Sequence, residues 1–141
     1  MRLYTCFLLW LISSCYSSAA FSQTDSCQLR ISLLTCSPGE ELYSIFGHSA
    51  IRAVDSGAHT DIVYNYGTFE FDDDFYYNFV RGGDRLQYYL SVSGFRDFMY
   101  EYQVFNRSVI EQVLSLDCEE KHRLYAALQH NALNANRYYR Y

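Results

Sequence analysis

The sequence predicts an α+β domain with an antiparallel sheet. Most apolar segments alternate apolar and polar side chains, which is the pattern of a half-buried strand, and fewer show helical spacing. Aromatic residues form 18% of the chain, and its 15 Tyr and 10 Phe favour a strand-rich fold. With 141 residues, the chain is long enough for one hydrophobic core and too short for two ordinary domains.

Residues 1–22 are expected to be a secretory signal peptide that lies outside the fold. A short positive start precedes an apolar run at residues 3–12, and small residues at 17–22 suit cleavage. The run is too short to cross a bilayer, which takes about 20 residues. A lipoprotein signal is the alternative, because Cys15 ends a segment that resembles a lipobox and would carry the lipid. Either signal exports the product, so we expect a bacterial periplasm or cell envelope and place the domain at residues 23–141.

The domain is predicted to begin with a strand and a turn. Residues 28–36 are apolar and rich in Leu and Ile, as a strand would be. Pro38 and Gly39 then break the apolar run, and the residues after them suit a short helical turn. Gly47 closes this segment and lets the backbone turn sharply into the next strand.

A β-hairpin is predicted next. Residues 49–54 and 61–66 alternate as strands do, and the turn-forming residues 55–59 lie between them. Alternation places Tyr64 and Tyr66 on one face of the second strand and the polar residues on the other.

The second half of the chain is predicted to mix strands and helices. Residues 71–82 begin with three Asp and end with Arg-Gly, an order that suits the dipole of a helix. Residues 85–93 alternate and predict a strand, and residues 94–102 predict a short helix with an aromatic face. Residues 107–116 predict a further strand, with Ile110 and Leu114 pointing inward.

The last predicted element is a capped helix. Residues 117–120 have the Asp-x-x-Glu form of a helix N-terminus, and the helix should run to about residue 131. The spacing turns Leu124 and Leu128 toward the core. It leaves the two histidines of the helix, His122 and His130, outside.

Charge and motifs exclude several classes of function. The chain has 11 Lys and Arg against 16 Asp and Glu, and it has no basic run, so we expect no nucleic-acid partner. It has no Gly-rich phosphate loop. The three adjacent Asp at residues 72–74 would point in different directions on a helix, and the spaced acids of a calcium loop are absent. We therefore expect no cofactor and no metal, and the sequence does not indicate an oligomeric state.

The cysteines of the exported chain are odd in number. Cys6 and Cys15 lie in the signal segment, which leaves Cys27, Cys36 and Cys118. In an oxidising compartment one pair can close while one thiol remains, but the sequence does not choose the pair. Cys36 ends an apolar strand and fits a buried structural thiol. Cys118 opens a predicted helix, whose dipole can lower the pKa of a thiol.

His48 is the candidate centre of any chemistry. It lies where a loop enters a strand, and a neutral imidazole held there can act as a general base near neutral pH. A catalytic His needs a partner that orients its ring, and Asn65 on the neighbouring strand is the first choice, with Asp61 the second. The alternative for each of these residues is an ordinary hydrogen-bonded position at a strand.

Several segments resemble blocks of one protein family. Residues 32–52, which contain His48, resemble the opening motif of the DUF4105 family, the N-terminal periplasmic domain of Lnb-type lipoprotein N-acyltransferases. Residues 63–69, 79–82 and 136–141 resemble later blocks of that family in the same order. The resemblance covers about residues 28 to 141.

The resemblance implies a circularly permuted papain-like fold, with a catalytic His early in the chain and a nucleophilic Cys late. In the family an Asp-Asn-Cys motif follows the Tyr-Arg-Tyr block, and this sequence ends inside that block at Tyr141. The resemblance therefore implies a partial domain whose nucleophile lies beyond Tyr141. The complete domain would attack an acyl ester, form a thioester, and pass the acyl group to an amine or to water. A lipoprotein or phospholipid substrate at a membrane surface is then the expected partner.

Arg52, Tyr64 and Tyr66 are candidates to line the substrate groove beside His48 and Asn65. A function of a different class is also open, because aromatic rings suit recognition of apolar and sugar-like surfaces. The chain would then be a non-catalytic envelope module that binds lipid or cell-wall fragments through an aromatic surface.

Overall fold

The computed structural model describes residues 27–71, 75–81 and 86–140. The predicted signal segment, Cys15 and the three adjacent Asp lie outside these residues. The strands are β1 (Leu29–Cys36), β2 (His48–Asp55), β3 (Thr60–Phe69), β4 (Tyr88–Gly94), β5 (Val109–Val113) and β6 (Tyr138–Tyr139). The helices are α2 (Phe75–Arg81), α3 (Phe95–Val104) and α4 (Cys118–Asn131).

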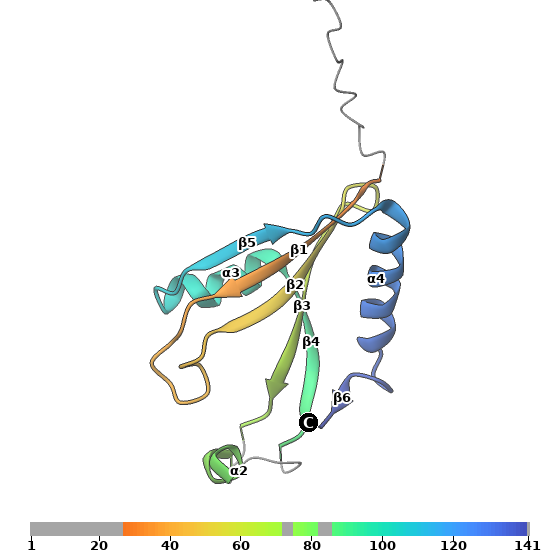
Figure 1. Cartoon of the computed structure of the whole chain (residues 1–141). Coiled ribbons are helices and arrows are strands. Elements are labelled where there is room, and N and C mark those ends of the chain that lie inside the picture. Colours follow the sequence, from red (N-terminus) through yellow and green to blue (C-terminus); the bar gives the residue numbers. More distant parts are fainter. Residues whose placement is uncertain (1–26, 72–74, 82–85, 141) are drawn as a thin grey trace, which may run out of the picture.

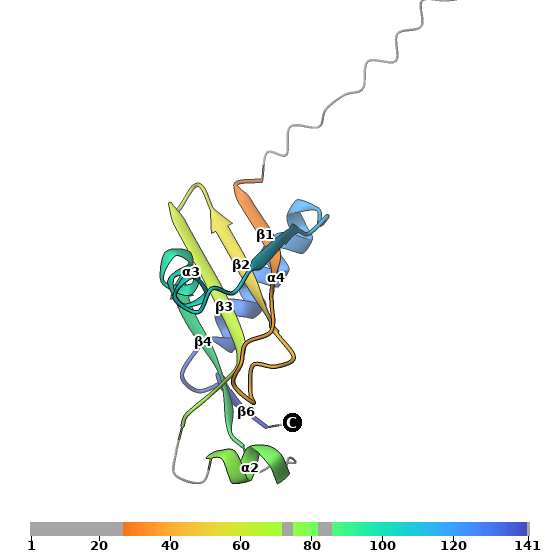
Figure 2. The ribbon, with the colours of Figure 1, turned by 90° about the vertical axis from the view of Figure 1, so that its left-hand side faces the viewer.

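The described residues form one open six-stranded sheet, in which neighbouring strands run antiparallel in the order β5-β1-β2-β3-β4-β6. This confirms the predicted α+β class and antiparallel sheet. Figures 1 and 2 show α3 and α4 on opposite faces of the sheet, with α2 beyond the lower ends of β3 and β4. Within the described part of the chain, no helix has the length and apolar character needed to span a membrane.

Each face of the sheet has its own core. Because side chains alternate along each strand, every second side chain points to the face that carries α3 and the others point to the face that carries α4. The core under α3 consists of Leu34, Cys36, Ala50, Val63, Phe98 and Tyr102. The core under α4 consists of Ala53, Tyr64, Leu90 and Leu128, with Leu124 and Tyr125 packed against it. Each fully buried large side chain stabilises the fold by about 1.5–3 kcal/mol.

The β2–β3 hairpin forms as predicted, and its turn determines which residues face each other. The Asp55 carboxylate accepts hydrogen bonds from the backbone N–H groups of Gly57 and Ala58 at 2.9 and 3.0 Å. The resulting register pairs Ile51 with Tyr64. The even-numbered residues of β2 therefore share the α3 face with the odd-numbered residues of β3.

The segment between Pro38 and Gly47 forms turns, in which Ser44 N–H bonds to Glu41 O at 2.8 Å and Gly47 N–H to Ser44 O at 3.0 Å, in agreement with the predicted short helical turn. The predicted strand at residues 107–116 differs in one respect. The side chain of Ile110 is 68% exposed, so its predicted inward position is wrong. Ile110 lies on the edge strand β5 opposite Thr35, which is also exposed, so neither side chain has a helix over it.

Helix α4 begins as predicted. The Asp117 carboxylate accepts from the backbone N–H of Glu120 at 2.8 Å, and the Glu120 carboxylate accepts from the N–H of Asp117 at 2.9 Å. Leu128 is buried, and His122 and His130 are exposed, as the helical spacing predicted.

Candidate functional site

His48 and Asn65 meet on the α3 face of the sheet. His48 is the first residue of β2 and Asn65 lies in β3. His48 Nε2 is hydrogen-bonded to Asn65 Oδ1. Because an amide oxygen can only accept, Nε2 carries the ring proton and Nδ1 keeps its lone pair. The structure therefore brings the two predicted catalytic residues together, with Nδ1 free to accept a proton.

The loop before His48 is held against the segment that immediately precedes β5. Arg107 donates from Nε and Nη2 to the carbonyl oxygen of Ser37 at 3.0 and 2.7 Å. The backbone N–H groups of Ser37 and Gly39 are also bonded, to Ser108 O and Ser44 O, each at 2.9 Å. A loop fixed at its start leaves His48 little freedom to move away from Asn65.

Two glycines allow the backbone to pass close to the imidazole. Gly47 has φ +74°, and a Cβ there would lie 2.6 Å from the carbonyl oxygen of Cys36. Gly67 has φ +82° at the irregularity of β3, and a Cβ there would lie 3.9 Å from His48 Cε1. Both backbone conformations disfavour an L side chain. The His48 ring is therefore bordered by bare backbone on the β3 side.

A cavity of about 190 Å³ opens beside this pair. His48, Asn65 and Gly67 share its lining with Glu101 and Arg107. A second cavity of about 590 Å³ is bordered by the same Glu101 and Arg107. The two cavities therefore lie on either side of Glu101 and Arg107, and only the first is lined by His48.

The sequence did not identify three residues of this lining, Tyr43, Glu101 and Arg107. They come from a turn, from α3 and from the segment before β5, and no spacing in the sequence connected them with His48. Burial raises the pKa of the Tyr43 hydroxyl, with a smaller contribution from Glu41. Tyr43 therefore remains a neutral hydrogen-bond donor in the cavity wall.

Cys36 lies directly across from His48 in the β1–β2 register, but its thiol is buried. Only 2% of the residue is exposed, and the thiol is a hydrogen-bond partner of Tyr102. Burial raises the pKa of the thiol, against smaller opposing effects of Tyr102 and Arg107. A protonated, enclosed thiol is a poor nucleophile, which agrees with the structural role expected for Cys36.

Arg52 shares the α3 face with His48 but lies four positions further along β2, roughly 13 Å away at the rise of a strand. It is paired with Asp61 at 2.6 Å and with Glu111 at 3.0 Å, and its guanidinium lies 3.4 Å over the ring of Phe95. Asp61, the second candidate to orient His48, is therefore engaged by Arg52. Neither residue lines the cavity beside His48.

Tyr64 and Tyr66 point to the opposite face, toward α4. Tyr64 is 3% exposed and packs edge-on against Tyr125. The hydroxyl of Tyr66 accepts a hydrogen bond from Asn131 at 3.0 Å. The sheet separates both rings from His48, so the structure does not bring these predicted groove residues to the cavity.

Comparison with protein families gives one match. A family model described as the Lnb N-terminal periplasmic domain matches residues 16–141. No curated protein and no solved structure matches the chain. The matched segment contains every described strand and helix, and it includes His48 and Asn65. The family supports a location in the periplasm or envelope. By this match, the chain belongs to the family of the Lnb N-terminal periplasmic domain.

Proposed function

We propose that this periplasmic domain supplies the general base of a thiol-dependent acyltransferase or hydrolase. The observation that carries the proposal is the hydrogen bond from His48 Nε2 to Asn65 Oδ1 at the wall of a cavity. It holds the imidazole in the tautomer whose Nδ1 can take a proton, which a Cys–His mechanism requires.

In the proposed reaction, His48 Nδ1 removes the proton of a Cys thiol. The thiolate attacks the carbonyl carbon of an acyl ester, a C–S bond forms, and the alcohol leaves with the proton from the imidazolium. An amine or water then attacks the thioester, gives its proton to His48, and releases the thiolate. Asn65 orients the ring throughout. A lipoprotein or phospholipid at a membrane surface is the proposed acyl donor.

The thiol of this mechanism is proposed to come from a segment that follows residue 141. Among the described residues, Cys36 is buried and Cys27 and Cys118 form a disulfide. Strand β6 pairs with β4, and the Tyr139 hydroxyl accepts a hydrogen bond from the backbone N–H of Gly67 beside His48. The Tyr139 side chain thus links β6 to the part of β3 that passes His48, and the proposed segment would cross the ends of β4 and β3 to reach the imidazole. We also propose the circularly permuted papain-like fold, which rests on the family resemblance alone.

The test uses the complete reading frame that contains this chain. The protein is incubated with a diacylglyceryl peptide and examined for a hydroxylamine-sensitive acyl adduct by mass spectrometry. We expect an adduct with the wild type and none with His48→Ala. Asn65→Ala should reduce the rate by about 10²–10⁴-fold, because the ring loses its orientation. An adduct in folded His48→Ala at the wild-type rate would refute the proposal.

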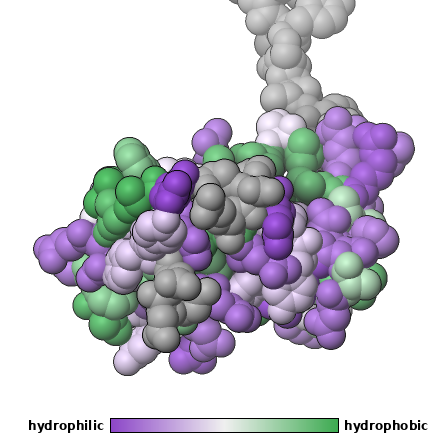
Figure 3. All heavy atoms as spheres, turned by 90° about the horizontal axis from the view of Figure 1, so that it is seen from below, coloured by the Kyte–Doolittle hydropathy of each residue, from purple (hydrophilic) through white to green (hydrophobic). Residues whose placement is uncertain are grey.

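A second function is favoured by the rings around α2. Phe69, Phe71 and Phe75 pack within 5.2 Å of one another by ring centroids, and Phe71 and Tyr76 remain 60% and 53% exposed. Figure 3 views the molecule from the α2 end and shows apolar residues among polar ones on this face. In this alternative, the chain is a non-catalytic module, and we propose that this surface binds lipid or cell-wall fragments.

One binding experiment distinguishes the two proposed functions. Phe71→Ser with Tyr76→Ser should abolish sedimentation with phospholipid vesicles if the aromatic surface binds lipid, and sedimentation with purified peptidoglycan is measured in parallel. His48→Ala should leave vesicle binding unchanged. Vesicle and peptidoglycan binding that survives the double substitution would exclude this surface.

A further inference from the structure

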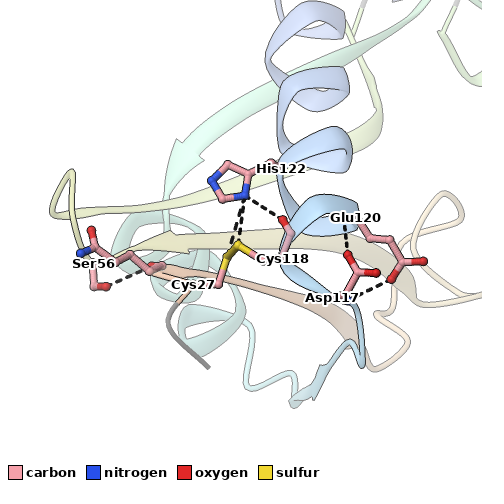
Figure 4. Close-up of a disulfide and its surroundings, with 7 residues drawn as sticks. Cys27, Ser56, Asp117, Cys118, Glu120 and His122 are labelled. Carbon is pink, nitrogen blue, oxygen red and sulfur yellow. Dashed lines mark hydrogen bonds between the residues drawn. A yellow bond between two sulfur atoms is a disulfide. The ribbon is translucent and has the colours of Figure 1, made fainter. Parts of the chain in front are cut away.

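Three side chains with soft or borderline metal-donor atoms converge at the start of α4, remote from the cavity linings described above. The Sγ atoms of Cys27 and Cys118 and Nδ1 of His122 all lie within 4.8 Å of one another. Nδ1 is 3.8 Å from Cys27 Sγ and 3.5 Å from Cys118 Sγ (Figure 4). In this structure the two sulfurs form a disulfide.

Local structure places these donors independently of the disulfide. Cys118 is the first residue of α4, and His122 follows one turn later on the same face of the helix. Cys27 precedes β1, and the next residue, Gln28, is anchored because its carbonyl oxygen accepts from the backbone N–H and the hydroxyl of Ser56 at 2.9 and 3.0 Å. Two donors therefore lie on a capped helix and the third on a strand end that is tied to a turn.

We propose that reduction of the Cys27–Cys118 disulfide opens a metal site, in which the two thiolates and His122 bind one Zn²⁺ ion. The reductant is a dithiol. It delivers two electrons and two protons to the protein, the Sγ–Sγ bond breaks, and the dithiol becomes its own disulfide. Zn²⁺ then displaces the two thiol protons. Water occupies the fourth position, as in three-ligand zinc sites.

The distances suit a tetrahedral ion. Bond lengths of about 2.3 Å to sulfur and about 2.05 Å to nitrogen require sulfur–nitrogen separations of roughly 3.6 Å. The two observed separations are 3.8 and 3.5 Å. The sulfurs must move apart to roughly 3.8 Å. Their Cα atoms are 5.6 Å apart, so rotation of the two side chains provides this movement without a shift of the backbone.

The imidazole must change tautomer and turn its Nδ1 from the Cys118 carbonyl toward the sulfurs when the ion binds. Nδ1 now donates to the carbonyl oxygen of Cys118 at 2.7 Å, so it carries the ring proton. Figure 4 shows the other ring nitrogen of His122 pointing away from the sulfurs. That nitrogen can take the proton while Nδ1 binds the metal. Cys118 and His122 are exposed, which gives the ion and its water ligand a route of entry.

Such an ion would preserve the connection between the start of β1 and α4 when the disulfide is lost. The two ends of this connection are 91 positions apart in the sequence. A covalent bond would hold them under oxidising conditions and a zinc ion under reducing conditions.

The experiment titrates Zn²⁺ into the full chain before and after reduction by a phosphine, which is removed under nitrogen. We expect one Zn²⁺ per reduced chain, none per oxidised chain, and a higher thermal midpoint of the reduced protein with Zn²⁺ than with EDTA. Co²⁺ in place of Zn²⁺ should give thiolate charge-transfer absorption and tetrahedral d–d bands. His122→Ala should weaken Zn²⁺ binding at least about tenfold. His130→Ala, at the other end of α4, should leave it unchanged.

Two results would overturn the proposal. One is a folded, reduced wild type that binds no Zn²⁺. The other is equal affinity in the wild type and His122→Ala, which would remove the imidazole from the site. If reduction alone unfolds the chain, Zn²⁺ must restore the circular dichroism of the native protein. Failure of Zn²⁺ to restore it would also overturn the proposal.

Discussion

The Cys27–Cys118 disulfide closes most of the described chain into one loop, and its removal should cost much of the stability of the domain. The residues it links are 91 positions apart. The chain-entropy relation for such a loop gives about 4.6 kcal/mol at 25 °C. Because domains of this size are stable by about 5–15 kcal/mol, the variant Cys27→Ser with Cys118→Ser should lose roughly a third or more of its free energy of unfolding.

Urea unfolding followed by far-ultraviolet circular dichroism measures this effect. With a urea m-value of about 1.5–2 kcal/mol/M, the midpoint should fall by about 2–3 M. The wild type reduced with a phosphine in EDTA provides a control, since it should unfold at the same midpoint as the double variant. The m-value should rise in both, because the unfolded chain expands when the loop opens. A midpoint shift under about 0.5 M in both proteins would refute the loop-closure reasoning.

Four further substitutions test the core and the site. Leu34→Ala should cost about 2–5 kcal/mol of unfolding free energy, because Leu34 is fully buried. Ile110→Ala should change the free energy of unfolding by less than about 0.5 kcal/mol, because Ile110 is 68% exposed. Gly47→Ala should cost more than about 1 kcal/mol in the same urea assay, because φ is +74° and the new Cβ would meet the Cys36 carbonyl. Burial is the main cause that raises the pKa of Tyr64 to about 12, and the neighbouring Tyr125 makes a smaller contribution. An unfolded Tyr titrates near pH 10. The stability that Tyr64 contributes is therefore complete below about pH 10 and lost as the pH rises toward 12, so Tyr64→Phe should flatten this part of the stability–pH curve. The burial argument would be contradicted if Leu34→Ala cost no more than Ile110→Ala. An unchanged urea midpoint in Gly47→Ala would contradict the argument from φ. An unaltered alkaline slope in Tyr64→Phe would contradict the argument from the pKa.

The pairing of His48 with Asn65 was predictable because a hairpin is a local structure. The turn residues 55–59 define the register, and alternation then places Asn65 on the same face as His48. The same alternation puts Tyr64 and Tyr66 on the face opposite Asn65, so it argued against their proposed place in a groove beside His48. The structure agrees with the alternation, because both rings point toward α4.

Long-range contacts account for the remaining differences. Arg52 forms ion pairs with Asp61 on the neighbouring strand and with Glu111 on β5, and Arg52 and Glu111 are 59 positions apart in the sequence. Strand β6 has two residues, too few for a periodic signal, and it exists because the chain returns to the edge of β4. Ile110 is exposed for a related reason, since only the fold determines how far a helix covers an edge strand.

The sequence by itself determined what depends on neighbours within about ten positions: strands β1 to β5, the β2–β3 hairpin, the capped start of α4, and the choice of His48 and Asn65 as candidates. Only the tertiary structure decided which two cysteines pair, that Arg107 and Glu101 line the same cavity as His48, and that the Tyr139 hydroxyl is bonded to Gly67. The physical reason is that alternation and capping act through short-range backbone geometry. The order of strands in a sheet, in contrast, brings together residues whose separation along the chain carries no periodic signal.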